Sequence, residues 1–507
     1  MLRSISSNWS LNALQILVFM VLTPFAVDAL GREDYGVWEV LVAAAGPLQL
    51  LALGLPMATV RAVSSAVAAQ DPDEASRAAG TSLSLTLILG ACAALIGLAV
   101  RATFAAYIAS EPEWSGLGAA RVADAKFALD VLLANVAAGF ALALPYALYD
   151  AHQDFVARNL IRGAGLIVKL GATIGFLTLR ADLTTLAFVQ IGVAALEFAV
   201  ALTVSRVRHP GVSLRPRAVR WTEARSLLSF SVFAFLLNMG ALLAFRIDAL
   251  VIGAHRPPAE AAVYGFGNKI FDPFIQVLLG IGMVLMPMAA AAARRNDLDA
   301  VREAFLRWSK IAVTIVALVG GYLMVLGPEF LAAWIGDEYS PRSGDLLRIL
   351  MLSFFLFLPV RGVALPVLMG LGRAKAPGLG LLAMGFANLG LSVALIGPYG
   401  LVGVALGTAI PNVVFSIVFA RTACVALDVG PLHWLGYAFV RPLAAALVAS
   451  AVLWGAAEWL EPTSFPVLVG AGVCYTALFG VLALAIAFRG DARFNLSLPG
   501  PLRRLGA

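Results

Sequence analysis

Residues 11–30 read LNALQILVFMVLTPFAVDAL, an apolar run in which Asp28 is the single charged residue. About 20 apolar residues in a helix match the ~30 Å thickness of the hydrocarbon layer of a bilayer. Comparable runs follow with little interruption as far as residue 488. We therefore predict fourteen membrane spans, at residues 10–30, 36–60, 79–100, 127–149, 160–179, 183–205, 226–252, 262–292, 310–335, 346–370, 378–397, 400–423, 436–459 and 465–488.

The composition agrees with this all-α, polytopic interpretation. Of the 507 residues, 61% are hydrophobic and 13% are charged, and the mean hydropathy is +0.90. Soluble domains carry about 25% charged residues, so we expect no separate soluble domain. The cysteines lie inside apolar spans and the histidines share no ligand spacing, so we expect neither a disulfide framework nor a metal or other cofactor. These residues are Cys92, Cys424, Cys474, His152, His209, His255 and His433.

The formal net charge of +6 could suggest a nucleic-acid partner, but its distribution indicates a membrane instead. Most Lys and Arg residues fall in the loops that the span assignment places on one side, as the positive-inside rule predicts for the cytoplasmic side. We expect both termini on that side and no nucleic-acid partner. The arginine-rich stretch 206–225 is read as a topology anchor, with binding of anionic lipid headgroups as the alternative.

The chain also contains a weak internal repeat. Asp28-Ala29-Leu30 recurs as Asp248-Ala249-Leu250, Pro56-Met57-Ala58 as Pro287-Met288-Ala289, and Ala143-Leu144-Pro145 as Ala364-Leu365-Pro366. An even number of spans per repeat gives two parallel lobes, an arrangement that transporters use to enclose a binding site near the membrane midplane. We predict a six-helix lobe at 1–205, a basic linker at 206–225, a second six-helix lobe at 226–425, and two additional helices with a tail at 426–507, with a central cavity between the lobes.

Arg361 is the strongest candidate for a binding residue. It lies between Pro359 and Pro366 in the tenth predicted span. Proline removes a backbone donor and bends a helix, and a guanidinium at such a bend offers a rigid fork for phosphate or carboxylate. The alternative is a salt bridge between helices.

Other polar residues inside the spans must face protein or water, because charges at the bilayer centre are costly. Lys269, Asp272 and Gln276 have the i, i+3, i+7 spacing of one helix face, although the first two could simply neutralise one another. We expect Arg361, Lys269, Arg246, Lys169, Asn238, Asn388 and Gln276 to contact cargo, and Glu39, Asp272 and Glu197 to carry a coupling proton or cation.

Two alternatives bear on these residues. Lys169 and Glu197 lie on neighbouring spans and could form an ion pair that is only structural. Asp248 lies within about a turn of the outer surface, so we expect it to anchor the seventh span rather than to bind a ligand.

Four segments carry a resemblance to a known family: residues 29–38 (ALGREDYGVW), residues 53–56 (LGLP) with Arg61 soon after, residues 246–265, which begin Arg-Ile-Asp and end Tyr-Gly, and residues 397–405 (GPYGLVGVA) near Asn388. With them the chain resembles the oligosaccharide and lipid-linked polysaccharide flippases of the multidrug/oligosaccharidyl-lipid/polysaccharide exporter superfamily.

The resemblance implies a non-enzymatic exporter of the bacterial inner membrane, with two lobes that open alternately to each side. Its cargo would be an undecaprenyl-diphosphate-linked oligosaccharide for polysaccharide or lipopolysaccharide (O-antigen) biosynthesis. Its partners would be membrane lipids and a polysaccharide polymerase or ligase.

Three other functions stay open at this stage. A cation-coupled multidrug exporter of the same superfamily would use Glu39 or Asp272. A lipid II flippase is disfavoured, because the first span has no basic residue after Arg3. A polytopic glycan polymerase or ligase needs an outer catalytic loop, and residues 101–126 offer few groups for one.

Overall fold

The computed structural model describes residues 2–52, 54–110, 114, 118–216, 235, 238–337, 340–373, 375–460 and 462–494. Every regular element in these ranges is a helix. Part of the predicted linker, from residue 217 onward, part of the predicted span 226–252, and the tail from residue 495 lie outside the described residues. The all-α prediction is confirmed.

Eleven helical stretches among the described residues are long and apolar enough to cross a membrane. Two of them, Ser10–Ala68 and Lys375–Ala426, are long enough for two crossings each. Both are interrupted at a glycine with positive φ, Gly31 (φ 78°, ψ 166°) and Gly400 (φ 58°, ψ −137°). The chain is therefore a multi-pass membrane protein, and the number of fourteen spans stays a prediction.

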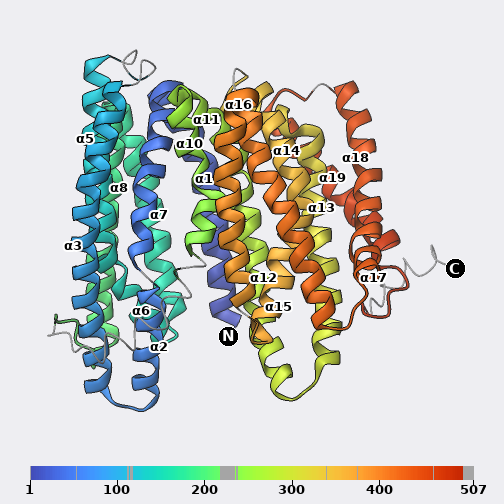
Figure 1. Cartoon of the computed structure of the whole chain (residues 1–507), viewed down its shortest axis with the longest axis horizontal. Helices are drawn as coiled ribbons and strands as arrows, with labels where there is room; N and C mark the ends of the chain where they lie inside the picture. The colour runs from blue at the N-terminus through green and yellow to red at the C-terminus, as the bar shows by residue number, and fades with distance from the viewer. Residues whose placement is uncertain are drawn as a thin grey trace. The chain divides into compact units, whose positions relative to one another are not determined.

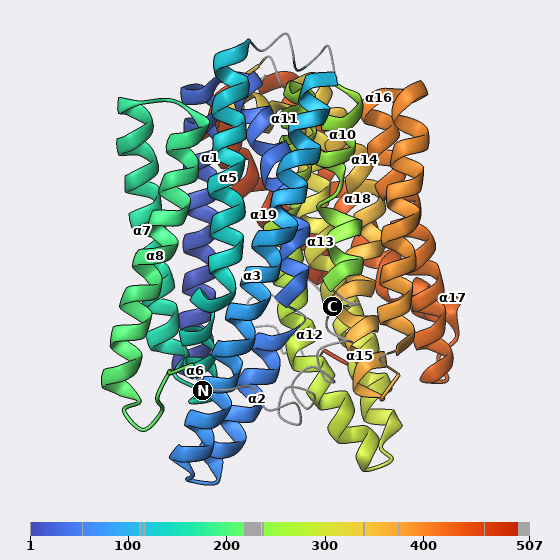
Figure 2. The same ribbon diagram turned by 60° about the vertical axis from the view of Figure 1, so that its left-hand side comes forward.

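The helices divide into two compact units. Figures 1 and 2 show these helices coloured by residue number from the N-terminus to the C-terminus. Unit 1 comprises Met1–Phe266 and Gly378–Thr408, and unit 2 comprises Gly267–Pro377 and Ala409–Ala507. The chain thus passes from one unit to the other three times. The lobe boundaries inferred from the repeat stay a prediction.

Unit 1 is built on long helices that run side by side, as α3, α5, α7 and α8 do in Figure 2. Its elements are α1 (Leu2–Ala45), the 3-10 helix η1 (Gly46–Ala52), α2 (Leu55–Ala68), α3 (Pro72–Ser110), α5 (Ala119–Leu142), α6 (Leu144–Ala151), α7 (Phe155–Leu179), α8 (Leu183–Arg208), α10 (Asp248–His255), most of α11 (Pro258–Lys269) and the first part of α16 (Lys375–Ala426).

The first part of α16 is a hairpin that turns at Gly400. A Cβ built on Gly407 would lie 2.7 Å from the backbone nitrogen of Ser392, so the two arms approach as closely as glycine allows. Small residues permit this close packing of membrane helices. Residues 378–408, which include the turn and the segments that face one another across it, belong to unit 1.

Unit 2 consists of α12 (Phe271–Arg294), α13 (Leu298–Ile335), α14 (Ser340–Pro359), η2 (Val360–Ala364), α15 (Leu365–Gly370), the rest of α16, α17 (Pro431–Leu435), η3 (Gly436–Val440), α18 (Arg441–Leu460), α19 (Phe465–Leu482) and η4 (Ala483–Phe488). η2, η3 and η4 are π-helical turns. The last two long helices, α18 and α19, pack on α13 (Figure 1) through an apolar cluster that includes Ala317, Ala449 and Phe479.

The chain that follows η4 is fixed to α13 by a buried ion pair. Lys310 Nζ lies 2.7 Å from Asp491 Oδ2, and the two side chains are 1% and 5% exposed. Tyr437 donates a hydrogen bond of 2.7 Å to the same carboxylate. Lys310, Tyr437 and Asp491 form what we call the C-terminal clasp. It joins the segment that follows the last helix to α13 and η3.

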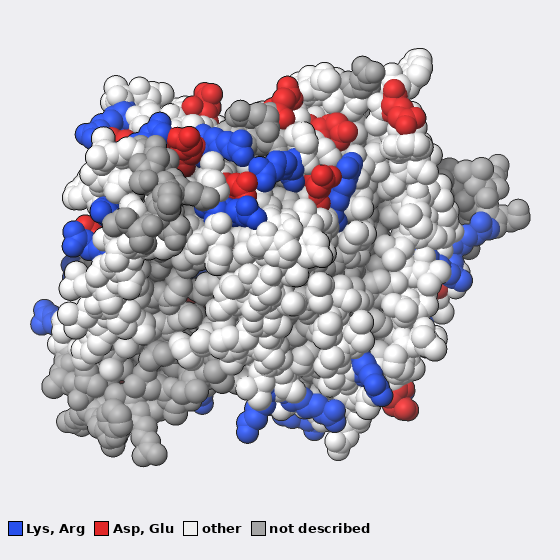
Figure 3. All heavy atoms as spheres, turned by 45° about the horizontal axis from the view of Figure 1, so that its top comes forward, with Lys and Arg blue, Asp and Glu red and all other residues white. Residues whose placement is uncertain are grey.

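Polar residues mark where several helices begin. Asp154, Asp182 and Asp297 accept hydrogen bonds from the backbone N–H groups three residues later, at the N-termini of α7, α8 and α13. Such caps satisfy N–H groups that have no partner within the helix. Between the caps the surface is apolar: Figure 3 shows charged side chains gathered near the helix ends and an uncharged surface between them, with side chains such as Leu98 61% exposed.

Candidate functional site

A polar cavity of about 590 Å³ lies inside unit 1. Helices α1, α3, α5, α6, α7 and α8 and the short helix η1 contribute to its wall. The wall contains two charged side chains, Arg162 and Glu197. It also contains the amides of Gln15, Gln49 and Asn135 and the hydroxyls of Thr86 and Tyr146. Sites with a few convergent polar groups in an otherwise apolar wall are typical of small-molecule recognition.

Tyr146, Arg162 and Glu197 form a connected group in this cavity. The Tyr146 hydroxyl donates a hydrogen bond of 3.0 Å to Glu197 Oε2. The Arg162 guanidinium carbon lies 4.7 Å from the centre of the Tyr146 ring, a cation–π distance. The tyrosine therefore links a cation to a carboxylate that belongs to another helix.

Local backbone features place these three side chains. Tyr146 lies in the first turn of α6, which begins at Leu144 and has Pro145 as its second residue, after α5 ends at Leu142. Gly165 of α7 faces Glu197 of α8, and a Cβ at this position would overlap the Glu197 carboxylate. The glycine therefore provides the space that the carboxylate occupies.

The electrostatics of the cavity are mixed, because its wall contains one cation, Arg162, and one carboxylate, Glu197. The positive charges of both Arg162 and Lys169 act on Glu197. Asn135 Oδ1 is buried and accepts no hydrogen bond within the described part of the chain. The cavity thus offers a guanidinium for anionic groups and amide and carboxylate acceptors for hydroxyl groups.

A second polar cluster in unit 1 surrounds Asp248, which is 2% exposed. Its Oδ2 accepts hydrogen bonds from the hydroxyls of Tyr264 (2.9 Å) and Thr408 (3.2 Å). Asn388 donates to Thr408 Oγ1 (2.9 Å) and to the carbonyl of Ala244 (3.1 Å). The network joins α10 to α11 and α16, which agrees with the expected anchoring role, and its depth in the membrane stays a prediction.

The Asp248 cluster has unused capacity for a positive charge. Asp248 Oδ1 is buried and has no hydrogen-bond partner among the described residues. A buried carboxylate without compensation is costly, and a proton or a small cation held by the surrounding oxygens would compensate it. Among all the residues that the structure describes, no three His, Cys, Asp or Glu side chains lie close enough together to bind a metal ion.

The other predicted residues of unit 1 lie apart from these two clusters. Arg246 is exposed in the turn that precedes α10, and Asn238 is also exposed. Glu39 is buried in α1, where a Cβ on Gly265 would lie 3.7 Å from its Oε2. The Tyr35 and Phe266 rings also stack, with centroids 5.4 Å apart, so the segments around Tyr35 and Tyr264 pack near one another.

Unit 2 holds the remaining predicted residues. Lys269 ends α11, whereas Asp272 and Gln276 belong to α12. Arg361 lies in the π-helical turn η2, with its guanidinium carbon 5.8 Å from the centre of the Phe357 ring. π-turns inside helices are frequent at functional sites, so this geometry keeps Arg361 a binding candidate.

Sequence reasoning missed most of the cavity wall. Gln15, Gln49, Asn135 and Tyr146 are isolated polar residues in four different elements, and no spacing along the chain connects them. One available signal was Ala143-Leu144-Pro145, because the helix break that it marks brings Tyr146 into the cavity.

Comparison with solved structures identifies the fold. A multidrug resistance MATE family transporter of the MOP superfamily in its inward-facing conformation superposes with a TM-score of 0.67, at 19% identity, over 82% of this chain and 98% of that one. The outward-facing conformation of such a transporter gives 0.55 at 20% identity, over 84% and 94%. A MOP superfamily transporter from Pyrococcus furiosus gives 0.56 at 18% identity, over 84% and 93%. The fold is that of the MOP superfamily transporters.

The sequence defines the family within that class. Residues 1–292 match the family model described as polysaccharide biosynthesis protein. The chain belongs to this polysaccharide biosynthesis family, and the resemblance stated from its sequence is confirmed. A curated relative, the uncharacterized membrane protein EpsK of Bacillus subtilis (strain 168), is 21% identical over 503 residues, which are 96% of this chain and 95% of the relative.

Proposed function

We propose that the protein exports an undecaprenyl-diphosphate-linked oligosaccharide from the cytoplasmic to the outer leaflet for polysaccharide or lipopolysaccharide biosynthesis. The polar cavity of unit 1, in a chain of the polysaccharide biosynthesis family, carries this proposal. Its guanidinium suits a diphosphate, and its amides and Glu197 suit sugar hydroxyls. A drug-like apolar cargo would leave these groups without partners.

The remaining parts of the proposal follow from how such a cargo must travel. The lobes open alternately to each side of a bacterial inner membrane, with both termini in the cytoplasm. Arg361, Lys269, Lys169 and Arg246 supply further positive charge for the diphosphate along its path, with Asn238, Asn388 and Gln276 as hydrogen-bonding groups.

Headgroup accessibility in reconstituted vesicles tests this function. Arg162→Ala should reduce translocation of the lipid-linked oligosaccharide by roughly tenfold or more, because a charge-assisted hydrogen bond to an anion contributes about 1.5–3 kcal/mol. Arg162→Lys should recover part of the rate. Arg180→Ala, at the exposed far end of α7, is the control. Equal translocation in wild type, R162A and R180A would contradict the assignment of the cavity.

A second candidate function is a cation-coupled exporter, and the unsatisfied oxygen of Asp248 favours it. Sodium or proton gradients should then drive transport in vesicles, and Asp248→Asn should abolish that dependence. Asp28, the exposed counterpart of Asp248 in the repeat, gives the control Asp28→Asn. Gradient-driven efflux of a dye, without movement of lipid-linked glycan, would favour the drug exporter over the leading proposal.

A further inference from the structure

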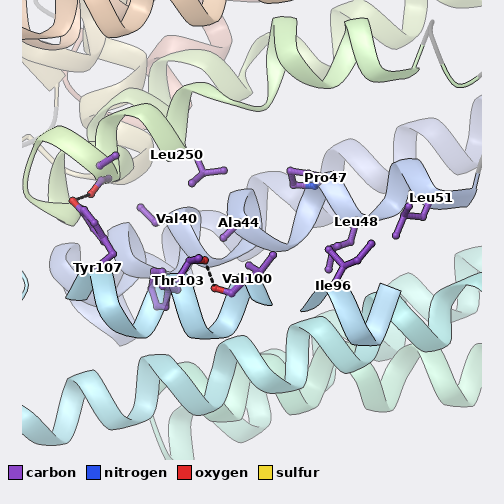
Figure 4. Close-up of a pocket in the computed structure, with 13 residues that line it drawn as sticks. Val40, Ala44, Pro47, Leu48, Leu51, Ile96, Val100, Thr103, Tyr107 and Leu250 are labelled. Atoms are coloured by element: carbon purple, nitrogen blue, oxygen red, sulfur yellow. Dashed lines mark hydrogen bonds between the residues drawn. The ribbon is translucent and has the colours of Figure 1, made fainter. Parts of the chain in front are cut away.

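An apolar pocket of about 550 Å³ lies in unit 1 next to the polar cavity (Figure 4). Its wall comes from the second part of α1, from η1, from α3 and from α10. Aliphatic side chains dominate this wall, including Val40, Leu48, Ile96, Val100 and Leu250. The volume lies within the ~300–1,000 Å³ range of small-molecule sites.

The pocket offers little polar surface to a ligand. None of its lining residues is charged. The Tyr107 hydroxyl donates to the carbonyl of Gly253 (2.9 Å), and the Thr103 hydroxyl donates to the carbonyl of Val100 (2.9 Å), as Figure 4 shows. A polar ligand would lose its hydrogen bonds to water without replacement, so the pocket selects hydrocarbon.

One short element separates this pocket from the polar cavity. Pro47, Leu48 and Leu51 of η1 line the apolar pocket, whereas Gln49 and Ala52 of the same helix line the polar cavity. The 3-10 helix η1 therefore divides a polar compartment from an apolar one.

Helix α3 also lines both compartments. Thr86 faces the polar cavity and Ile96 faces the apolar pocket. Ten residues of helix correspond to a rise of about 15 Å. The spacing suits an amphiphile with a polar headgroup on one side of η1 and a hydrocarbon chain on the other.

We propose that the apolar pocket binds part of the isoprenoid chain of the cargo while its diphosphate–sugar headgroup occupies the polar cavity. The inference rests on the proposed function, because that function supplies a cargo of this chemistry. Lipid tails are as apolar as the pocket wall, so chain binding stabilises the complex through van der Waals packing against that wall and not through the hydrophobic effect. The protein therefore holds both ends of the amphiphile within unit 1.

Photolabelling of the full-length protein in nanodiscs tests the proposal. The probe is a polyprenyl diphosphate with a diazirine in its chain, and a phosphatidylglycerol with the same diazirine in an acyl chain is run in parallel. We expect the isoprenoid probe to label peptides that contain Leu48 or Val100, and unlabelled undecaprenyl diphosphate to compete. Equal labelling by both probes, without competition, would assign the pocket to ordinary membrane lipid and overturn the proposal.

Substitutions that fill the pocket sharpen the test. Ala44→Phe and Val100→Phe each place a ring in the space for the chain, and we expect about tenfold less labelling than in wild type, because the ring removes the packing contacts that the chain would make. Leu98→Phe, on the exposed face of α3, adds similar bulk outside the pocket and should label normally. We use two substitutions so that the test remains valid if one variant misfolds. Gel filtration and thermal melting detect misfolding. Undiminished labelling in both folded variants would contradict the proposal.

The same vesicles separate this inference from the proposed function. A wild-type protein that translocates no lipid-linked oligosaccharide contradicts the function itself. Normal translocation by wild type and by both filled variants contradicts only the chain subsite. Wild-type translocation that falls in Ala44→Phe and Val100→Phe, but not in Leu98→Phe, supports both.

Discussion

At the scale of single residues, the absence of a side chain at Gly165 sets the position of Glu197. The Glu197 side chain extends from α8 into space that a Cβ at position 165 of α7 would fill, and there its carboxylate accepts the hydrogen bond from Tyr146. The polar cavity therefore depends on a glycine that itself makes no polar contact.

Gly165→Ala should displace the Glu197 carboxylate and break its hydrogen bond with Tyr146. The expected cost is about 1 kcal/mol, the net value of such a bond, together with a clear loss of transport. Thermal melting and vesicle translocation measure the two effects. Gly175→Ala on the same helix is the control, because its Cβ would meet nothing within 4 Å. An unchanged transport rate in G165A would contradict the role of Glu197 in the cavity.

Sequence reasoning at this scale selected Glu197 as a candidate, because a charge inside an apolar span needs a polar environment. It did not select Arg162, which lines the same cavity. The hydrogen-bond network of Asp248 was not predicted, because it comes from Tyr264, Asn388 and Thr408, which are distant along the chain. Such partners depend on which helices pack against one another, and the periodicity of apolar residues along the sequence does not predict that packing.

At the scale of elements, Gly400 allows α16 to turn back on itself. Its backbone has φ 58° and ψ −137°, a region that is essentially restricted to glycine. Gly400→Ala should destabilise the protein by on the order of 1–3 kcal/mol and lower its melting temperature. Gly390→Ala, in the helical arm of the same element, has open space around its Cβ and should melt at or above the wild-type temperature. Equal melting of G400A and wild type would show that the hairpin tolerates another turn.

The C-terminal clasp is the second element-scale prediction. Burial raises the pKa of Asp491, but hydrogen bonds from Lys310, Tyr437 and the backbone of Arg493 outweigh that effect and hold the pKa below its ordinary value. A carboxyl with a lowered pKa stabilises the folded state above its unfolded pKa of about 3.9, and the contribution is lost as the pH falls through the folded value. Asp491→Asn should therefore destabilise the protein near pH 7 and matter less below about pH 4.

Thermal melts of the purified protein across this pH range provide the measurement. Removing one partner of a buried ion pair costs about 3–5 kcal/mol, because the remaining charge stays buried. Glu303→Gln, which breaks the exposed pair with Arg493, should cost at most about 1 kcal/mol. If D491N and E303Q melt alike at pH 7, the clasp does not hold the two additional helices.

Most helices of this protein could be predicted from apolar run length. That signal does not distinguish one long helix from two helices joined at a glycine. The interruptions at Gly31 and Gly400 depend on dihedral angles that a glycine permits but does not require. The π-turn at Arg361, by contrast, lies where Pro359 and Pro366 indicated a departure from regular helix.

At the scale of the whole molecule, the proposed cargo links transport to the membrane potential. Moving one negative charge outward across an inside-negative potential of 100 mV releases about 2.3 kcal/mol. A potassium gradient with valinomycin, imposed on vesicles, should speed outward movement of the diphosphate-linked glycan when the cytoplasmic side is negative and slow it when the sign is reversed. A rate that is the same at both signs would mean that the charge of the cargo is neutralised during transport.

The chain passes between the two units three times, and this has a consequence for any gene fragment that encodes only one half. A polypeptide that stopped at Phe266 would keep Asp248 and Tyr264 but lack Asn388 and Thr408, which the α16 hairpin returns to unit 1. The truncated product would bury an acidic group with half of its donors missing. The two halves of the sequence therefore do not correspond to separable folding units.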